Sequence, residues 1–409
     1  MREKMKLPKG WEVKKLGEIF TIERGGSPRP IEEYMTDDDD GINWIKIGDT
    51  KNVVKYILHT REKIKPEGLK KSRMVYEDDF ILSNSMSFGK PFIMKTTGCI
   101  HDGWLVIRKS EIIDNNYLYY ILSSSLVYQQ FSNLAKGSTV KNLNIEAVKQ
   151  VVISFPPLAE QTTIISKIEE LLSDLENGKQ QLLTAQTQLK VYRQSLLKWA
   201  FEGKLTNKKG KWENVRLGEV ANAIDPQPSH RTPPVVQDGI PFVSIKDFDS
   251  EKDTIDFINA RKVSNEVLNE HLERYKLEIG DFVIGKIGTI GKPVRIVLPQ
   301  NYSLSANIVL IQPRKINPTY LFYFFQSNLI KKAFTAGMTA TSQPAFGIQK
   351  VRELRIDLPN KEEQTRIVEE LESKLTICDK IAETISQSLL QAETLRQSIL
   401  KKAFEGKLI

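Results

Sequence analysis

The segment Ala200-Phe-Glu-Gly-Lys-Leu205 returns letter for letter as Ala403-Phe-Glu-Gly-Lys-Leu408, a shift of 203 positions (403 − 200). At the same shift, Glu160-Gln161-Thr162 returns as Glu363-Gln364-Thr365. Nearer the start of each copy the shift changes slightly, which small loop insertions explain. Chance can produce one short match, but it does not produce a collinear series of matches. The chain is therefore interpreted as two copies of one module.

The two copies cover roughly residues 1–205 and 206–409, and each changes character partway through. Its first part carries short runs of β-branched and aromatic residues, such as Asn43–Ile47, interrupted by Gly and Pro. Such runs predict strands of a mixed α/β domain. A helical pattern at 117–131, echoed at 320–334, makes each domain α+β. The order of the strands cannot be recovered from these patterns.

The last part of each copy predicts a long helix with a coiled-coil seam, because apolar residues recur there at alternating spacings of four and three. The seam is predicted to contain Ile164, Ile168, Leu171, Leu175, Leu182, Leu189 and Leu196 in the first helix, and Ile367, Leu371, Ile381, Ile385, Leu395 and Ile399 in the second. Tyr192 and Trp199 continue the first stripe. Both helices follow a proline and end at Gly203 or Gly406, where glycine can adopt positive φ.

The two helices are expected to pair with each other, since each alone would expose its apolar stripe. An antiparallel pair requires the least additional chain and relates the modules by a pseudo-twofold axis. A helix of about 40 residues, at ~1.5 Å per residue, is a rod of roughly 60 Å. Such a rod matches roughly 17 base pairs at about 3.4 Å each. The expected segments are a domain at 1–155, a helix at 156–205, a domain at 206–358 and a helix at 359–409.

Composition favours a polyanionic partner without proving one, because the net charge is +8 and many basic proteins have other roles. Cys99 and Cys378 are the only cysteines, so neither a disulfide framework nor a zinc spacing is present. A reducing cytoplasm fits this usage. The first ten residues resemble no signal peptide, and no stretch is long and apolar enough to be a membrane span.

Three motifs that could carry chemistry are rejected. Phe155-Pro-Pro-Leu158 is only superficially similar to the motif with which adenine-N6 methyltransferases hold the target amine, because position 155 lacks a polar group. The run Gly285–Lys292 is no Walker motif, since its spacing is wrong and Pro293 follows the lysine. The four histidines lack ligand spacing, and the acidic run 37–40 is better interpreted as a solvated loop. We therefore expect neither a metal nor a catalytic residue in this chain.

The same Gly-rich run, and a polar loop later in each domain, are predicted to face DNA. Glycine allows close backbone approach, and Lys, Thr, Ser, Asn and Gln can reach phosphates or base edges. The candidates are Ser83, Asn84, Ser85, Lys90, Lys136, Ser138, Thr139, Lys141 and Asn142 in the first copy, and Lys286, Thr289, Lys292, Thr339, Thr341, Ser342 and Gln343 in the second. Plain surface polarity remains the alternative for each single residue.

The ordered series of motifs resembles the specificity subunit of type I restriction-modification systems over nearly the whole chain. The series comprises Pro8–Trp11, Leu16–Glu18, Gly137–Asn144, Ile153–Leu158, Glu160–Gln161 and the helix end at Phe201–Leu205. The second copy departs at Leu358-Pro-Asn360, with one proline instead of two, and at 337–341. Neither departure disturbs the layout.

The resemblance implies two target recognition domains, spacer helices and no catalytic activity in this chain. It also implies that the helices bind two methyltransferase subunits, which carry S-adenosylmethionine, and that restriction subunits complete the enzyme. Such a complex would methylate adenine at N6 or cut unmodified double-stranded DNA, and its two half-sites would differ because the modules differ.

Two other function classes stay open from the sequence. A DNA methyltransferase or nuclease in its own right would transfer methyl groups or cut DNA without partners. A coiled-coil scaffold with duplicated protein-binding domains would show no salt-dependent DNA affinity.

Overall fold

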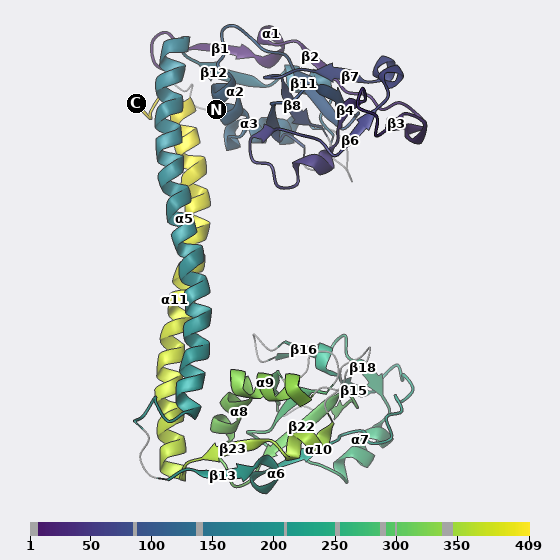
Figure 1. The fold of residues 1–409 in the computed structure, drawn as a ribbon, viewed down its shortest axis with the longest axis vertical. Helices are drawn as coiled ribbons and strands as arrows, with labels where there is room; N and C mark the ends of the chain where they lie inside the picture. The colour runs from purple at the N-terminus through teal and green to yellow at the C-terminus, as the bar shows by residue number, and fades with distance from the viewer. Residues whose placement is uncertain are drawn as a thin grey trace. The chain divides into compact units, whose positions relative to one another are not determined.

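The structure is a computed structural model, which describes residues 7–84, 88–135, 142–207, 211–249, 254–286, 292–298, 301–337 and 347–409. The chain forms two compact units, Met1–Leu182 with Gln387–Ile409, and Leu183–Ser386. Each unit holds one mixed α/β domain, part of the long helix α5 (Leu158–Phe201) and part of the long helix α11 (Lys361–Phe404) (Figure 1). The predicted fold class, with two similar domains and two long helices, is confirmed.

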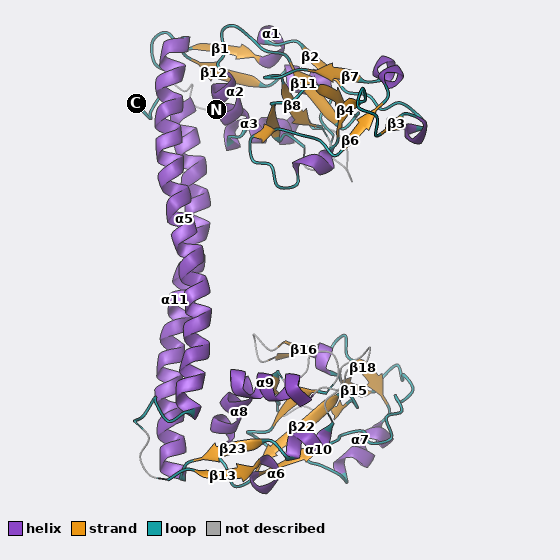
Figure 2. Cartoon of the chain, viewed as in Figure 1, coloured by secondary structure: helices purple, strands orange, loops and turns teal. Residues whose placement is uncertain are grey.

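The first unit builds two sheets and a short outer ribbon (Figure 2). Its strands are β1 (Glu12–Lys15), β2 (Ile22–Arg24), β3 (Met35–Thr36), β4 (Ile42–Ile45), β5 (Tyr56–Ile57), β6 (Glu62–Ile64), β7 (Arg73–Val75), β8 (Phe80–Ser83), β9 (Pro91–Met94), β10 (Gly98–Ile100), β11 (Trp104–Ile107) and β12 (Val152–Phe155). Its helices before α5 are α1 (Leu16–Ile19), η1 (Ile31–Glu33), η2 (Ile47–Thr50), η3 (Pro66–Lys71), α2 (Asn115–Leu122), α3 (Ser125–Leu134) and α4 (Ile145–Lys149). The sheets have the orders β2-β11-β8-β9-β5 and β3-β6-β4-β10-β7, and β1 pairs with β12.

The first of these sheets is buried on both faces. Successive side chains of a strand point to opposite faces, so neighbours along β11 enter different cores. Leu105 packs in a core that also contains residues of α2, α3 and α5, while Val106 packs in a second core with residues of β4 and β10. This double burial explains why β8 and β11 are almost entirely apolar.

The second unit repeats this plan with fewer strands. Its elements are β13 (Glu213–Arg216), α6 (Leu217–Val220), β14 (Ala221–Ile224), β15 (Ile240–Val243), η4 (Ile245–Asp247), β16 (Phe248–Asp249), β17 (Thr254–Ile255), β18 (Arg261–Val263), α7 (Asn265–Leu272), β19 (Phe282–Gly285), β20 (Pro293–Arg295), β21 (Ser303–Leu304), β22 (Ile308–Pro313), α8 (Pro318–Gln326), α9 (Asn328–Gly337), α10 (Ile348–Arg352) and β23 (Arg355–Leu358). The sheets have the orders β14-β22-β19-β20 and β18-β15-β21, with β13 paired to β23 and β16 to β17.

The predicted ends of the long helices are confirmed. Helix α5 ends before Gly203 and α11 before Gly406, and both glycines have positive φ, 74° and 68°. The following amide closes each last turn, with Lys204 N donating to Trp199 O at 2.8 Å and Lys407 N to Lys402 O at 2.9 Å. These bonds satisfy carbonyl groups that a helix end would otherwise leave unpaired.

Within each unit the beginning of one long helix packs against the end of the other, so the pair is antiparallel. In the first unit Ile164 and Ile168 share a core with Leu400. In the second unit Leu196 shares a core with Ile367 and Leu371. Most of the residues predicted for the seam are covered, as Leu171, Leu175, Leu182 and Leu189 are half-buried and Ile385 and Ile399 are buried.

Two seam residues were predicted wrongly: Ile381 is 44% and Leu395 52% exposed. Tyr192 and Trp199, at the end of the first stripe, are also exposed. The buried and half-buried positions of α11 include a series with a strict alternation of four and three, namely 371, 375, 378, 382, 385, 389, 392, 396 and 399. The alternation selects Ala382 and Arg396, whereas hydrophobicity alone selects their more hydrophobic neighbours Ile381 and Leu395.

Candidate nucleic-acid interface

A buried glutamine at the start of each long helix fixes its domain to that helix. Gln161 Nε2 donates to Pro156 O at 2.9 Å, and its Oε1 accepts from Asp114 N at 2.8 Å. Gln364 repeats this pattern with Pro359 O at 2.8 Å and Asn317 N at 2.8 Å. The repeated Glu-Gln-Thr motif thus has a structural cause, because each amide joins the helix start to the loop that caps α2 or α8.

A buried tyrosine of each domain packs against the last turn of the long helix that belongs to the other copy. Tyr117 meets the ring of Phe404 edge to face at a centroid distance of 5.2 Å, and Tyr320 meets Phe201 at 5.1 Å. Their hydroxyls donate to Ser154 O at 2.9 Å and to Asp357 O at 3.2 Å. The repeated Ala-Phe-Glu-Gly-Lys-Leu segment is therefore the part of each helix that the domain of the other copy binds.

Ser83 and Asn84, which were predicted to contact DNA, are buried in the first unit. Ser83 Oγ accepts from Lys90 N at 3.0 Å, and Asn84 Nδ2 donates to Asp102 O at 2.9 Å. These bonds tie the two sides of the loop together and anchor it to the turn before β11. We interpret both side chains as supports of the loop, and DNA contact stays a prediction for the exposed Lys90.

In the described residues, the chain next to one predicted loop of the first domain contacts the chain next to the other. Leu143 N donates to Asn84 O at 2.8 Å, and the rings of Phe88 and Tyr128 stack with centroids 5.8 Å apart. Asn142 is exposed beside this contact and also stays a predicted DNA contact. Ten further candidates lie outside the described residues, namely Ser85, Lys136, Ser138, Thr139, Lys141, Thr289, Thr339, Thr341, Ser342 and Gln343.

Lys286 and Lys292 of the second unit have different environments. The ammonium of Lys286 is 13% exposed and lies 2.8 Å from Asp225 Oδ2, so it is neutralised within the domain. It occupies the place of Asn84, since Lys286 N donates to Asn307 O as Asn84 N donates to Gly103 O. Lys292 is exposed and borders a cavity of about 540 Å³, which Lys246 and the carboxylates Asp247, Asp249 and Asp256 also line. A phosphate contact therefore stays a prediction for Lys292.

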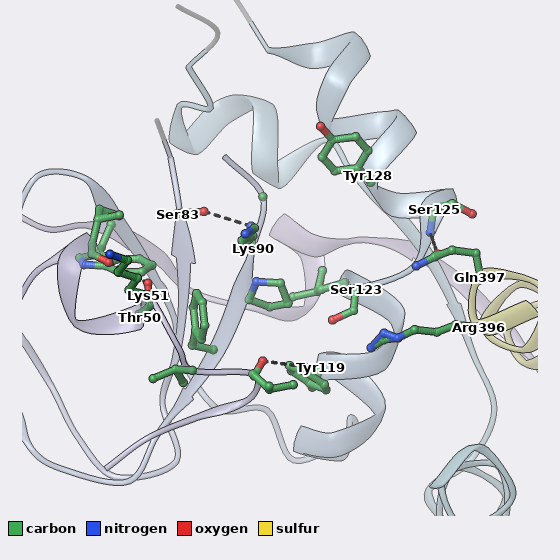
Figure 3. A pocket seen from close by; sticks show the side chains of 18 of the residues that line it. Thr50, Lys51, Ser83, Lys90, Tyr119, Ser123, Ser125, Tyr128, Arg396 and Gln397 are labelled. Atoms are coloured by element: carbon green, nitrogen blue, oxygen red, sulfur yellow. Dashed lines mark hydrogen bonds between the residues drawn. The ribbon is translucent and has the colours of Figure 1, made fainter. Parts of the chain in front are cut away.

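A cavity of about 820 Å³ in the first unit lies between the domain and α11 (Figure 3). Lys51, Lys90 and Arg396 line it together with the hydroxyl groups of Ser123 and Tyr128. Its charged lining residues are all cationic, so it suits an anion such as a DNA phosphate.

Helix α11 contributes a second polar side chain to this cavity beside Arg396. Gln397 Oε1 accepts from Ser125 N at 2.9 Å, which attaches the start of α3 to α11. This part of the site was not predicted from the sequence, because Leu395 rather than Arg396 was expected to face the other helix. The strict heptad phase, which places Arg396 on the inner face, could have revealed it.

The described residues contain no group of three or more His, Cys, Asp or Glu side chains placed to hold a metal ion. In the same part of the chain, every helix is too short or too polar to traverse a lipid bilayer.

The chain belongs to the family described as the type I restriction modification DNA specificity domain, whose model matches residues 8–185 and 209–391. The two matched segments correspond to the two copies found in the sequence. The chain is 25% identical over 432 residues to the specificity subunit of the type I restriction enzyme EcoKI from Escherichia coli (strain K12), covering 98% of this chain and 90% of that protein. It is 22% identical to the MjaIX specificity subunit of Methanocaldococcus jannaschii, covering 98% and 94% of the two chains.

Solved structures share the fold. The HsdS subunit from Thermoanaerobacter tengcongensis superposes with a TM-score of 0.61 at 21% identity, over 99% of each chain. A chain from a structure on complex assembly and conformational transition of the type I R-M system gives a TM-score of 0.73 at 20% identity, over 98% of this chain and 99% of that one.

Proposed function

We propose that this chain is the DNA specificity subunit of a type I restriction-modification enzyme and has no catalytic activity of its own. Residues 1–155 and 206–358 act as target recognition domains, while 156–205 and 359–409 form the spacer helices. The observation that carries the proposal is the internal repeat of one family domain, with the same helix attachment in both copies. Two readers on one chain suit a bipartite DNA site.

The two half-sites of that DNA should differ, because the domains share their attachment but differ in their polar loops. The net charge of +8 supports long-range attraction to the duplex.

The exposed apolar side chains of the long helices support docking of partner subunits. Val191, Tyr192 and Trp199 are exposed on α5, and Leu390 and Leu395 on α11. Large exposed apolar side chains on a helix favour protein contact. We propose that two methyltransferase subunits carrying S-adenosylmethionine bind there, that restriction subunits complete the enzyme, and that the complex works in the cytoplasm on double-stranded DNA.

A methylation assay tests the proposal. The full chain is assembled with its methyltransferase subunits, plasmid DNA is incubated with S-adenosylmethionine, and modified adenines are mapped by sequencing. We expect a bipartite motif with an unspecified centre, and no methylation by the chain alone. A continuous motif, or methyl transfer by the isolated chain, would contradict the proposal.

An exchange of residues 1–155 for the corresponding domain of a relative should change only one half of the motif. DNA affinity that does not fall with salt would instead favour a protein scaffold.

A further inference from the structure

Both domains contain a cavity at the same place in the fold. In the first unit a cavity of about 650 Å³ lies between the chain after β2 and the ends of the parallel strands β4 and β10. In the second unit a cavity of about 380 Å³ lies between the chain after β14 and the ends of β15 and β21. The strand registers match, because Cys99 faces Trp44 and Ser303 faces Phe242.

The backbone around the two cavities is held in the same way. Asp49 Oδ2 accepts from Lys46 N at 2.8 Å in the first unit. Asp247 Oδ2 accepts from Ser244 N at 2.8 Å in the second. The residue after β10 or β21 donates to the neighbouring strand in both units, to Ile45 O or Val243 O. The side chains that line the two cavities are therefore attached to backbones with the same hydrogen-bond pattern.

The side chains on this frame differ at each matched position. Superposition of the strand registers pairs Trp44 with Phe242, Lys46 with Ser244, His101 with Ser305, and Asp102 with Ala306. Such a change of donors and acceptors on a constant backbone is what two readers of different base sequences require. The contacts to the long helices, by contrast, keep their residue types.

The first cavity is lined by two carboxylates, Glu32 and Asp102, of which Asp102 directly follows the end of β10 and its turn residue His101. The side chain of Asp102 is 49% exposed, and Ser27 Oγ donates to its Oδ1 at 2.7 Å. The hydrogen bond from Ser27 lowers the pKa of Asp102, so the group is ionised at neutral pH. The neighbouring His101 is partly buried, and this burial lowers its pKa. Lys46 is paired with Glu62, which leaves Asp102 as an oriented, accessible acceptor.

In the second cavity the exposed Lys and Arg side chains are cationic hydrogen-bond donors. Arg231 is exposed on its rim, and Arg261 also lines it. The buried Gln227 orients the loop, because its Nε2 donates to Arg231 O at 3.2 Å and its Oε1 contacts the ring of His271. His271 belongs to α7, for which the first unit has the short helix η3 instead. The loop that carries Arg231 is thus supported from inside the domain.

We propose that these two cavities read base edges, Asp102 in the first half-site and Arg231 in the second. A carboxylate accepts a hydrogen bond from the exocyclic amine of cytosine or adenine, and a guanidinium donates two bonds to guanine O6 and N7. This inference rests on the proposed function and assigns specificity to residues that the loop predictions did not include.

The experiment is a selection from duplex DNA libraries with randomised half-sites, using the full chain assembled with its methyltransferase subunits. For Asp102→Ala we expect base preference at one or two positions of a single half-site to fall by about 5- to 150-fold, the equivalent of roughly 1–3 kcal/mol per base contact. The other half-site should keep its profile. Arg231→Ala should lower base preference by a similar factor in the other half-site and leave the first half-site unchanged.

Two variants separate base reading from support. Ser27→Ala removes the bond that orients Asp102 but keeps the carboxylate, so it should weaken the same preference without abolishing it. Glu111→Ala removes an exposed carboxylate outside the cavity and should leave both profiles unchanged. Thermal unfolding of each complex confirms that the variants fold.

The outcomes distinguish this inference from the proposed function. If the unmodified complex selects a bipartite site and Asp102→Ala and Arg231→Ala leave both profiles intact, the cavities do not read bases and the inference fails alone. The inference also fails if Asp102→Ala and Ser27→Ala lower all positions of a half-site equally, because that result indicates loop support. If the unmodified complex selects no bipartite site, the proposed function itself fails.

Discussion

The first and second units attach to the long helices through the same contacts, yet they differ where a domain can meet a ligand. Tyr117 and Tyr320 make equivalent bonds to backbone carbonyls, and Gln161 and Gln364 make equivalent bonds at the helix starts. At the cavities, a carboxylate in the first unit has an alanine as its counterpart. Attachment depends on a shared packing geometry, whereas reading depends on exchangeable polar groups, so the two roles can diverge independently.

The largest expected effect concerns the shared attachment. Tyr117→Ala should reduce the free energy of unfolding by about 3–5 kcal/mol, because a fully buried aromatic ring is lost and a cavity remains. Tyr320→Ala should have a similar effect on the second unit. Chemical denaturation combined with hydrogen exchange, resolved by unit, measures both.

Tyr117→Phe is the matched control, since it keeps the ring and removes only the bond to Ser154 O. It should cost about 1 kcal/mol. Equal losses for Phe and Ala would show that ring packing against Phe404 contributes little.

A smaller effect concerns a matched pair of buried aspartates. Asp79 is paired with Arg108 at 2.6 Å, whereas the equivalent Asp281 accepts from the neutral amide of Gln312 at 2.6 Å. Asp79→Asn should cost roughly 1–3 kcal/mol, since Arg108 then loses one of its two ion pairs and keeps the other with Glu23.

Asp281→Asn should be neutral or stabilising at pH 7, because burial raises the pKa of Asp281 and so disfavours its ionised form. Urea denaturation of the two variants gives the comparison. If both variants lose the same free energy of unfolding, the ion pair of Asp79 with Arg108 adds no more stability than the hydrogen bond of Asp281 with Gln312.

The third effect concerns phosphate contact in the first unit. Lys90→Ala should weaken DNA binding uniformly across sequences and lower the slope of log affinity against log salt by about 1. Lys90→Arg keeps the charge and should keep the slope. A titration by fluorescence anisotropy at several salt concentrations measures it, and a change in base preference would argue for base contact by Lys90 instead.

The smallest effect concerns pH. Burial lowers the pKa of His271, so the unfolded chain takes up a proton that the folded second unit does not as pH falls below 6.5. Stability should therefore decrease from pH 7 toward pH 5.5. His271→Gln should flatten this slope even if it lowers stability overall.

Burial also lowers the pKa of His101, so the stability of the first unit should depend on pH in the same direction. Thermal unfolding at several pH values compares His271→Gln with His101→Gln. An unchanged slope in both variants would assign the pH dependence to other groups.

Much of the fold could be predicted from local patterns. The repeat, the two long helices and their ends at Gly203 and Gly406 follow from spacing and residue type. The spacing identified mostly covered positions on the two helices, but Ile381 and Leu395 are exposed because each lies beside the inward position. The strand order could not be predicted, because pairing joins residues such as Glu12 and Phe155 that are far apart in the chain.

The candidate site was predicted less completely. Polar residue types identified the loop around Asn84 and Lys286, but the type of a side chain does not tell whether it is buried by its own domain. The cavities were missed because each combines residues from separate segments, such as Ser27, Trp44 and Asp102.

The sequence alone determined that the chain is a duplicated module with a heptad helix in each copy, because repetition and periodicity are properties of neighbouring positions. Only the tertiary structure decided that Ser83, Asn84 and Lys286 are largely covered by their own domains, and that Asp102 and Arg231 line matched cavities. Burial and hydrogen bonding depend on which distant segments meet, and this depends on strand register and packing, which local spacing does not encode.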